Sequence, residues 1–242
     1  MIQPSKKWLF PVILFLAFTL QSLGQEHQTY EGSLQVGPYS GKAVYQYTII
    51  DLDTIYDGDF QLQNSNLETL MENEDSSFRF KGSFDEGVAN GPWEFQFGEF
   101  QTNSQTQVVD NEYRVLVSGV QEIGAGNLDQ GAPDGEWTYT INKIKDSEID
   151  KILFKSTISF DNGVPQQNFQ IENDSSVLVG RLLRDGLAHD EWSFYGTENV
   201  EDIEDWFFDD GLLRSIQLKS ENGTEDIEVF NANLPNYEVT AL

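Results

Sequence analysis

The stretch GSFDEGVANGPWEF at residues 82–95 recurs as GNLDQGAPDGEWTY at residues 126–139. Glycines, an aspartate and a tryptophan keep identical spacing in the two copies. The shared positions are Gly82, Gly87, Gly91 and Trp93 in the first copy and Gly126, Gly131, Gly135 and Trp137 in the second. A repeat of this kind indicates one structural unit that is used several times, so it says more about architecture than about chemistry.

Two weaker copies extend the pattern toward both ends of the chain. The later copy has Gly180, Gly186 and Trp192, with one extra residue between the two glycines. Asp190 stands in place of its last glycine. In the earlier copy, which begins at residue 32, the glycines keep their spacing but Ala43 replaces the tryptophan. The unit therefore runs through most of the chain with irregular spacers.

Each copy predicts a β-hairpin. Residues 78–84 and 93–97 alternate aromatic residues or glycine with polar residues, which is the period of a strand with one buried face. The residues between them, 85–92, are rich in Asp, Asn, Gly and Pro, which form turns. A single hairpin is only marginally stable in water, so the hairpins must stack to bury a shared face. The sequence therefore predicts an all-β fold, an elongated sheet of stacked antiparallel hairpins with the motif tryptophans in its core.

Gly82, Gly126 and Gly180 fall inside predicted strands and not at turns. Glycine inside a strand often marks the close approach of another group. We expect each of these glycines to make room for a bulky aromatic side chain, the tryptophan of a neighbouring hairpin. Two charged segments, 143–151 and 198–205, are compatible with either a loop or a short helix.

The elements Gly-x-aromatic, Gly and Gly-x-Trp-x-aromatic in residues 82–95 and 126–139 resemble MORN-type repeats. The variant found in secreted and antitoxin-like bacterial repeat proteins is the most similar. The resemblance extends over residues 30–215 or thereabouts, while Ala43, Asp190 and the long spacers depart from it. It implies stacked antiparallel hairpins and a scaffolding or binding role, with no conserved catalytic site.

The N-terminus has the pattern of a secretory signal peptide. Lys6 and Lys7 precede an apolar run from Leu9 to Leu20, and small residues follow before Gln25. The run is short for a membrane span, although an uncleaved single-pass anchor is the alternative. We therefore expect a signal peptide at 1–24, a repeat domain at 25–242, and export to the periplasm or the extracellular space.

The charge balance is strongly acidic. The chain has 41 Asp and Glu against 14 Lys and Arg, a net charge of −27. Nucleic acids and anionic membrane surfaces are poor partners for such a chain, because both require clustered basic residues. The acids are explained by a solvated surface that discourages aggregation, or by a basic protein partner, or by divalent cations.

Few residues are candidates for chemistry. The chain has no cysteine and only two histidines, His27 and His189, and none of the common nucleophile, phosphate-binding or zinc motifs is present. An acidic cluster is formed by Asp51, Asp53, Asp57 and Asp59, and the first three are candidate ligands for Ca²⁺, which prefers carboxylate oxygens. Their spacing does not match an EF-hand loop. We expect no other cofactor.

The function that follows is an exported, non-enzymatic scaffold that binds a protein partner outside the cytoplasm. A polysaccharide-binding module or a glycan-active enzyme of the cell envelope is the alternative. Sugar binding would require exposed aromatic rings on the sheet, and glycan hydrolysis would require two close carboxylates in a cleft.

Overall fold

A computed structural model describes residues 27–64, 76–109, 112–197 and 202–229. The predicted signal peptide lies outside these residues. Every element in the described part of the chain is a β-strand. The strands are β1 Gln28–Val36, β2 Tyr39–Ile50, β3 Asp53–Asn64, β4 Ser76–Asp85, β5 Val88–Val109, β6 Glu112–Asp129, β7 Ala132–Lys145, β8 Glu148–Asp161, β9 Val164–Asn173, β10 Ser176–Leu182, β11 Ala188–Gly196, β12 Ile203–Asp209, β13 Leu212–Ser220 and β14 Gly223–Glu228.

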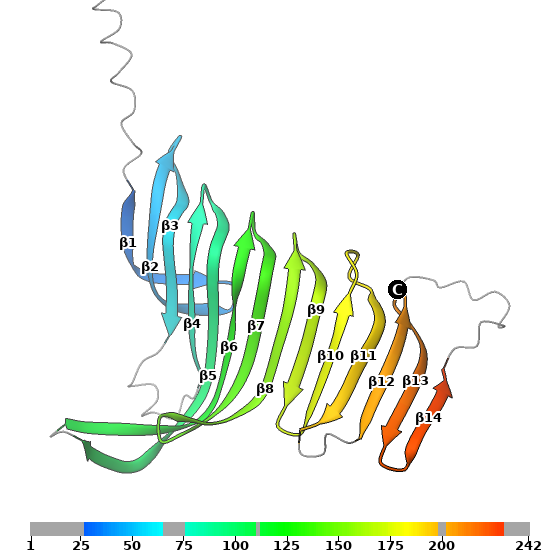
Figure 1. The fold of residues 1–242 in the computed structure, drawn as a ribbon. Coiled ribbons are helices and arrows are strands. Elements are labelled where there is room, and N and C mark those ends of the chain that lie inside the picture. The colour runs from blue at the N-terminus through cyan, green and yellow to red at the C-terminus, as the bar shows by residue number, and fades with distance from the viewer. Residues whose placement is uncertain (1–26, 65–75, 110–111, 198–201, 230–242) are drawn as a thin grey trace, which may run out of the picture.

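The fourteen strands form one antiparallel sheet in which each strand pairs with the next in the sequence. Figure 1 shows a single open layer that twists along its length, with the lower ends of β5 and β6 bending away from it. The predicted all-β architecture of stacked antiparallel hairpins is therefore confirmed. Within the described residues there is no helix with the length and hydrophobicity needed to cross a bilayer.

Tight turns close most hairpins along the upper edge in Figure 1. At Glu86-Gly87 and Gln130-Gly131 both central residues have positive φ, as type I′ turns require. At four turns of this edge the glycine also donates its N–H to a carbonyl of the preceding hairpin. These bonds are Gly87 to Tyr56 at 2.7 Å, Gly131 to Ala89 at 2.9 Å, Gly163 to Pro133 at 2.8 Å and Gly211 to Ala188 at 2.8 Å. The turns therefore connect successive hairpins in addition to closing their own.

The motif tryptophan covers the motif glycine of its own hairpin. A Cβ on Gly82 would lie 2.2 Å from Cδ2 of Trp93, and one on Gly126 would lie 2.3 Å from Cδ2 of Trp137. Because β4 and β5 form one hairpin, the expectation that a neighbouring hairpin supplies the ring is wrong. The glycine leaves space for an indole that lies flat on the adjacent strand of the same unit.

A bulge brings the indole to this position. Three residues, 91–93, stand opposite the single residue Gly82, and the register of the pair shifts there. The first of the three has positive φ, 77° at Gly91 and 73° at Gly135, and Asp190 adopts 60° in the later copy. Aspartate is one of the few non-glycine residues that tolerate this region, so the substitution keeps the bulge.

The indole N–H fixes the bulge. Nε1 of the tryptophan donates to the carbonyl oxygen of the residue that follows the motif glycine in all three copies. The bonds run from Trp93 to Ser83 at 3.2 Å, from Trp137 to Asn127 at 2.8 Å and from Trp192 to Arg181 at 3.1 Å. In the earliest copy, by contrast, Gly32 pairs with Ala43 in regular register, so the unit without a tryptophan also lacks the bulge.

One face of the sheet carries the apolar side chains. Registered pairs and the three bulges place one row across all fourteen strands: Tyr30, Tyr45, Phe60, Gly82, Trp93, Gly126, Trp137, Ile158, Phe169, Gly180, Trp192, Trp206, Ile216 and Ile227. We call this side the aromatic face and the opposite side the polar face. Trp93 and Trp192 are buried, with 7% and 6% of their surface exposed, whereas Trp137 is partly exposed.

The tip of the first hairpin folds over the aromatic face. In Figure 1 the lower ends of β1 and β2 curl behind the sheet. The ring of Tyr39 packs edge-on against Phe80, with centroids 4.9 Å apart, and against Phe78 at 5.1 Å. The largest core cluster lies beneath and beside this tip: Ala43, Phe60, Leu62, Phe80 and Trp93.

The two charged segments with ambiguous sequence patterns belong to strands. Residues 143–151 form the end of β7, a tight turn at Asp146-Ser147 and the start of β8. Of the segment 198–205, residues 198–201 lie outside the described chain and the rest enters β12. Neither forms a helix where it is described, because strand pairing with neighbours decides the conformation of short polar segments.

Candidate functional site

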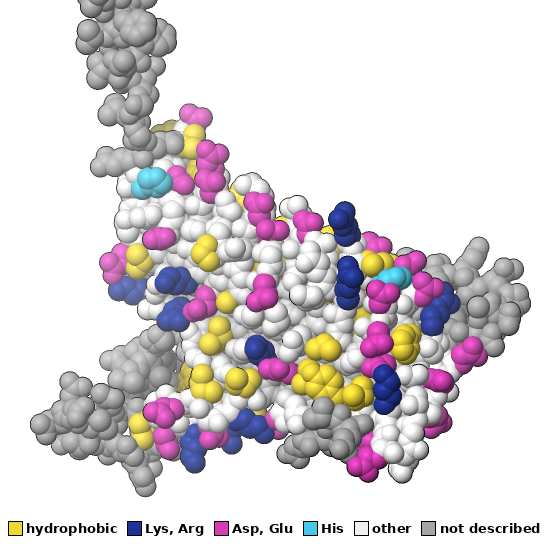
Figure 2. All heavy atoms as spheres, in the orientation of Figure 1, with side chains coloured by type: hydrophobic (Ala, Val, Ile, Leu, Met, Phe, Trp, Pro, Cys, Tyr) yellow, Lys and Arg dark blue, Asp and Glu magenta, His cyan; other side chains and the backbone are white. Residues whose placement is uncertain are grey.

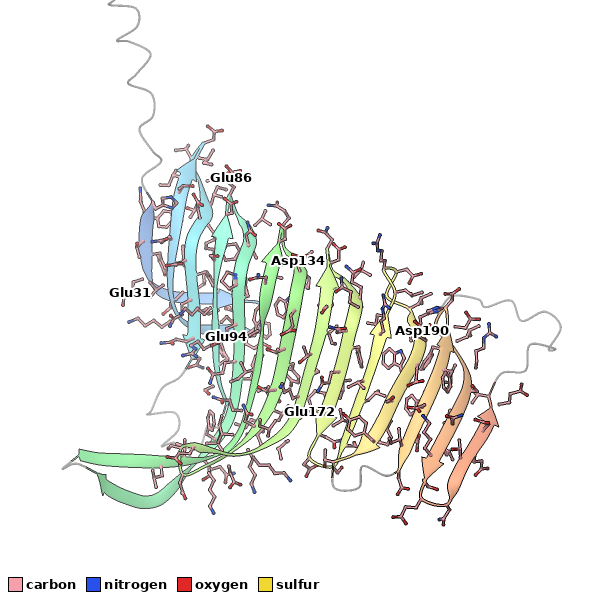
Figure 3. All side chains as sticks on the ribbon, in the orientation of Figure 1. Glu31, Glu86, Glu94, Asp134, Glu172 and Asp190 are labelled. Carbon is pink, nitrogen blue, oxygen red and sulfur yellow. The ribbon has the colours of Figure 1, made fainter. Side chains whose placement is uncertain are left out.

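The turns along the upper edge of the sheet present a row of acids. Figure 3 labels three acids near this edge, Glu86, Asp134 and Asp190. At least one exposed acid lies at each of six successive turns, and we call the set the acidic turn edge: Asp51, Glu86, Asp129, Asp161, Asp185 and Asp210. Strands lie about 4.8 Å apart, so these acids recur about every 10 Å.

Few cations neutralise the acidic turn edge. Arg214 binds the carboxylate of Asp209 at 2.8 Å, and exposed Arg184 lies in the β10–β11 turn. The tight turns 51–52, 86–87 and 130–131 contain no basic residue. Because exposed charges a Debye length apart are only partly screened, the row of acids creates a negative potential along this edge.

The opposite edge is mixed in charge. At the β7–β8 turn Lys143 lies 3.4 Å from Asp150, and Lys151 lies 2.7 Å from Asp174. The hydrogen bond and charge of Lys151 hold the pKa of Asp174 below its usual value. Among the described residues, these lysines neutralise part of the acidic charge at the opposite edge.

The polar face carries scattered ion pairs. Figure 2 shows acids, bases and small apolar groups interspersed on the visible side. Lys42 binds Glu31 at 2.7 Å and lowers its pKa through a hydrogen bond and its charge. Arg79 binds Glu94 at 2.8 Å. Such exposed ion pairs contribute little to stability. Because positive and negative groups alternate on this face, it attracts a charged partner less strongly than the acidic turn edge does.

One acid on the polar face is buried. Asp205 is 2% exposed and accepts a hydrogen bond from the hydroxyl of Ser193 at 2.7 Å. Lys219 forms an ion pair with it, and this bond raises the pKa of the lysine. The sequence analysis missed Asp205, because an alternating polar position in a strand normally faces solvent. The charge complement on Lys219, two strand positions along its partner, was the available signal.

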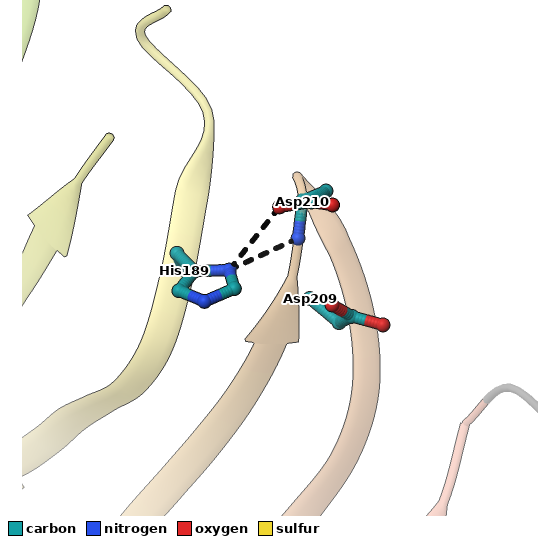
Figure 4. Close-up of side chains that lie close together, drawn as sticks. All are labelled: His189, Asp209 and Asp210. Atoms are coloured by element: carbon teal, nitrogen blue, oxygen red, sulfur yellow. Dashed lines mark hydrogen bonds and ion pairs between the residues drawn. The ribbon is translucent and has the colours of Figure 1, made fainter. Parts of the chain in front are cut away.

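His189, Asp209 and Asp210 are the one metal-ligand group found among the described residues, with potential ligand atoms all within 4.8 Å of one another (Figure 4). Each member already has a partner. The Nδ1 atom of His189 accepts the backbone N–H of Asp210 at 3.2 Å, and Arg214 binds Asp209. These bonds explain why the three side chains lie together at the turn.

The three predicted calcium ligands are not gathered into such a group. Asp51 lies in the β2–β3 turn with positive φ, Asp53 begins β3, and Asp57 lies at a bulge farther along that strand. Nδ1 of His27 donates a hydrogen bond to the backbone oxygen of Asp57 at 3.0 Å and lies 3.7 Å from the carboxylate of the same residue. The structure therefore gives the calcium prediction no added support.

The remaining predicted residues are structural. The motif glycines and tryptophans form the turns, bulges and stacked rings described above and do not converge on a reactive centre. No protein-family model matches the chain, and no curated protein matches it. The candidate site is therefore assigned from geometry and charge alone.

Proposed function

We propose that this chain is an exported, non-enzymatic scaffold that binds a basic protein through the acidic turn edge. The observation that carries the proposal is the regular recurrence of exposed acids at six turns of one continuous sheet. A partner with Lys or Arg side chains spaced by about 10 Å would meet one acid per hairpin. Electrostatic complementarity of this kind steers association and selects partners by charge.

The repeat architecture supports a scaffolding role. Stacked hairpins build an extended edge whose length grows with the number of units, as in other repeat proteins. The likeness to MORN-type repeats and the signal-peptide pattern supply the other parts of the proposal, a binding role and a location outside the cytoplasm. They rest on residues 82–95, 126–139 and 1–24.

The chemistry of the acids favours binding over catalysis. Catalytic carboxylates usually have a pKa shifted by burial or by a close second carboxylate. Among the described residues Asp205 is the one buried acid, and Lys219 and Ser193 already satisfy it. The acids of the turn edge are exposed, which suits long-range attraction of a partner.

A pull-down tests the proposal. The exported chain serves as bait for envelope and secreted fractions of the source cell, and bound proteins are identified by mass spectrometry. We expect one saturable basic protein that is released at high salt. Material retained as polysaccharide, without a protein partner, would refute the proposal and favour the glycan-binding alternative.

A matched pair of variants locates the contact. The triple variant Glu86→Gln, Asp129→Asn, Asp161→Asn removes three charges from the turn edge. The control Glu221→Gln, Glu225→Gln, Glu228→Gln removes three exposed charges from β14 and the turn before it. We expect the first to weaken binding by about tenfold or more and the second by less than about threefold. Equal losses would assign the effect to net charge and not to the edge.

A further inference from the structure

A cavity of about 530 Å³ lies between the aromatic face and the tip of the first hairpin. Its roof is formed by residues 36–39, the turn between β1 and β2. Its floor is formed by aromatic and aliphatic side chains of β3, β4 and β5, among them Phe60, Leu62 and Trp93. Small-molecule sites in proteins span about 300–1,000 Å³, so the volume is that of a ligand pocket.

The lining is almost entirely carbon. No charged residue contributes to it, and the lining residues with a polar side-chain atom are Tyr39, Tyr56 and Trp93, whose indole N–H is already bonded to the carbonyl of Ser83. A sugar or an ion would lose its hydrogen bonds to water on entry and find few replacements. Each polar group left unpaired in this way costs roughly 2–7 kcal/mol. The cavity therefore excludes the ligands that the rest of this acidic surface would attract.

Rings dominate the lining. Trp93 and Phe95 stack with centroids 5.6 Å apart, and Phe80 meets Phe95 edge-on at 5.7 Å. Their mixed orientations offer both ring faces and ring edges to a guest, and aromatic pairs gain energy in such offset and edge-to-face contacts. Apolar cavities lined by Leu and Phe in other proteins take up small aromatic compounds.

The roof confines the guest to a small molecule. Tyr39 packs against both Phe80 and Phe97, with centroids 4.9 Å and 5.8 Å apart, so the tip is anchored to the floor on one side. The roof turn contains Gly37 and Pro38, which close it in two residues. A strand or helix of a second protein would have to lift this hairpin tip, whereas a flat ring system would not.

We propose that the cavity under the β1–β2 tip binds an uncharged molecule with a flat aromatic or polycyclic ring system. This site is separate from the acidic turn edge in position and in chemistry. A protein that attracts a basic partner at one edge thus also carries a small-molecule site on its aromatic face.

A dye titration tests the site on the full exported chain. N-phenyl-1-naphthylamine is uncharged, contains two ring systems and fluoresces when it leaves water. We expect saturable binding at one site per chain. Naphthalene should displace the dye, and decanol should not. Displacement by decanol as readily as by naphthalene would overturn the assignment to ring systems.

A filled cavity provides the decisive comparison. Val36 lines the roof and is 47% exposed, so Val36→Trp places a ring in the cavity at little risk to folding. Val44, 39% exposed, lies on the polar face opposite Glu31 and Gln61, and Val44→Trp is the matched control. We expect the first to weaken dye binding by about tenfold or more and the control by less than about twofold.

Other results would overturn the proposal. These are no saturable binding, equal effects of the two tryptophan variants, or one dye per two chains together with concentration-dependent dimers in sedimentation. If thermal melting shows that Val36→Trp is unfolded, Pro38→Phe fills the same roof from an exposed position and replaces it. The salt dependence of the pull-down is independent of this result, so failure of either proposal is recognisable.

Discussion

The two ends of the sheet use the same hairpin unit and bury it differently. Near the N-terminus, Trp93 lies in a cluster with Phe60, Phe84 and Phe95, beside a hairpin tip that forms a second layer. Near the C-terminus, Trp192 is as buried as Trp93, and the ring contacts that the described residues give it come from the same layer, Phe169 at 4.9 Å and Phe208 at 5.6 Å. The unit thus buries its own tryptophan, while the folded tip thickens the core.

The C-terminal end of the sheet also buries a side chain on the polar face. There the polar face holds the buried Asp205 between Ser193 and Lys219. A single layer can bury residues on both sides only where large neighbours shield them. The comparison shows that the repeat determines register and bulge, whereas the surroundings of each copy determine how much surface becomes core.

The largest expected effect tests the role of the second layer. Trp93→Ala should lower the free energy of unfolding by about 3–5 kcal/mol, because the ring is buried within the largest cluster. Trp137→Ala, in the uncovered middle of the sheet, should cost about 1–2 kcal/mol, since its ring is partly exposed. Urea denaturation measures both. Equal losses would show that the tip adds nothing to the core.

The second effect tests the space under the indole. Gly126→Ala should destabilise by about 2–3 kcal/mol, because its Cβ would lie 2.3 Å from the ring of Trp137. Gly124→Ala lies on the same strand and face, where the nearest atom is 3.8 Å away. That variant should be neutral or stabilising by less than about 1 kcal/mol. Thermal melting compares the two, and a harmless Gly126→Ala would contradict the bulge account.

The third effect tests the burial of Asp205 on the polar face. Lys219→Met leaves the buried carboxylate of Asp205 with only the hydroxyl of Ser193, and should cost about 1–2 kcal/mol. The matched variant Arg79→Met removes an exposed pair with Glu94 near the other end and should cost less than about 0.5 kcal/mol. Similar losses in urea denaturation would show that Asp205 is not effectively buried.

The smallest effect tests the middle of the sheet at alkaline pH. Burial and a 2.5 Å hydrogen bond to Glu122 raise the pKa of Tyr139 to about 12. The unfolded chain loses this proton near its ordinary pKa of 10, so stability is complete below pH 10 and falls as the pH rises toward 12. Because the side chain is partly exposed, the loss should not exceed about 1 kcal/mol.

Tyr139→Phe isolates that contribution. Urea denaturation between pH 9 and pH 11.5 or so should show a shallower decline than in the unchanged protein. Tyr195→Phe, which removes a hydroxyl from the polar face, serves as the control. Lys219 contributes in the same direction in both proteins, since its pKa is also raised. Identical slopes for the two variants would contradict the assignment to Tyr139.

Much of the fold was predictable because it is local. Period-two alternation in residues 78–84 and the turn residues around Gly87 predict a hairpin, and the repeat predicts that hairpins stack. The exact partner of the motif glycine was not predictable. Spacing in sequence does not say whether a ring crosses to its own strand pair or to the next, and only the bulge at 91–93 decides this.

The candidate sites were less predictable than the fold. The excess of acids is visible in the composition, but their concentration at the turns of one edge depends on the alternation of turns between the two edges of the sheet. The predicted group Asp51, Asp53 and Asp57 is close in sequence and yet is not gathered, because Asp51 lies in the turn and Asp57 lies at the bulge farther along β3. The cavity under residues 36–39 had no signal in the sequence.

The sequence by itself determined the all-β class, the hairpin unit, the glycine and tryptophan spacing and the acidity, because each depends on neighbours within about fifteen residues or on composition alone. The tertiary structure decided which glycine each indole covers, the fold-over of the β1–β2 tip, the burial of Asp205 and the alignment of acids on one edge. These features depend on sheet twist and on contacts between strands distant in sequence, which no local pattern encodes.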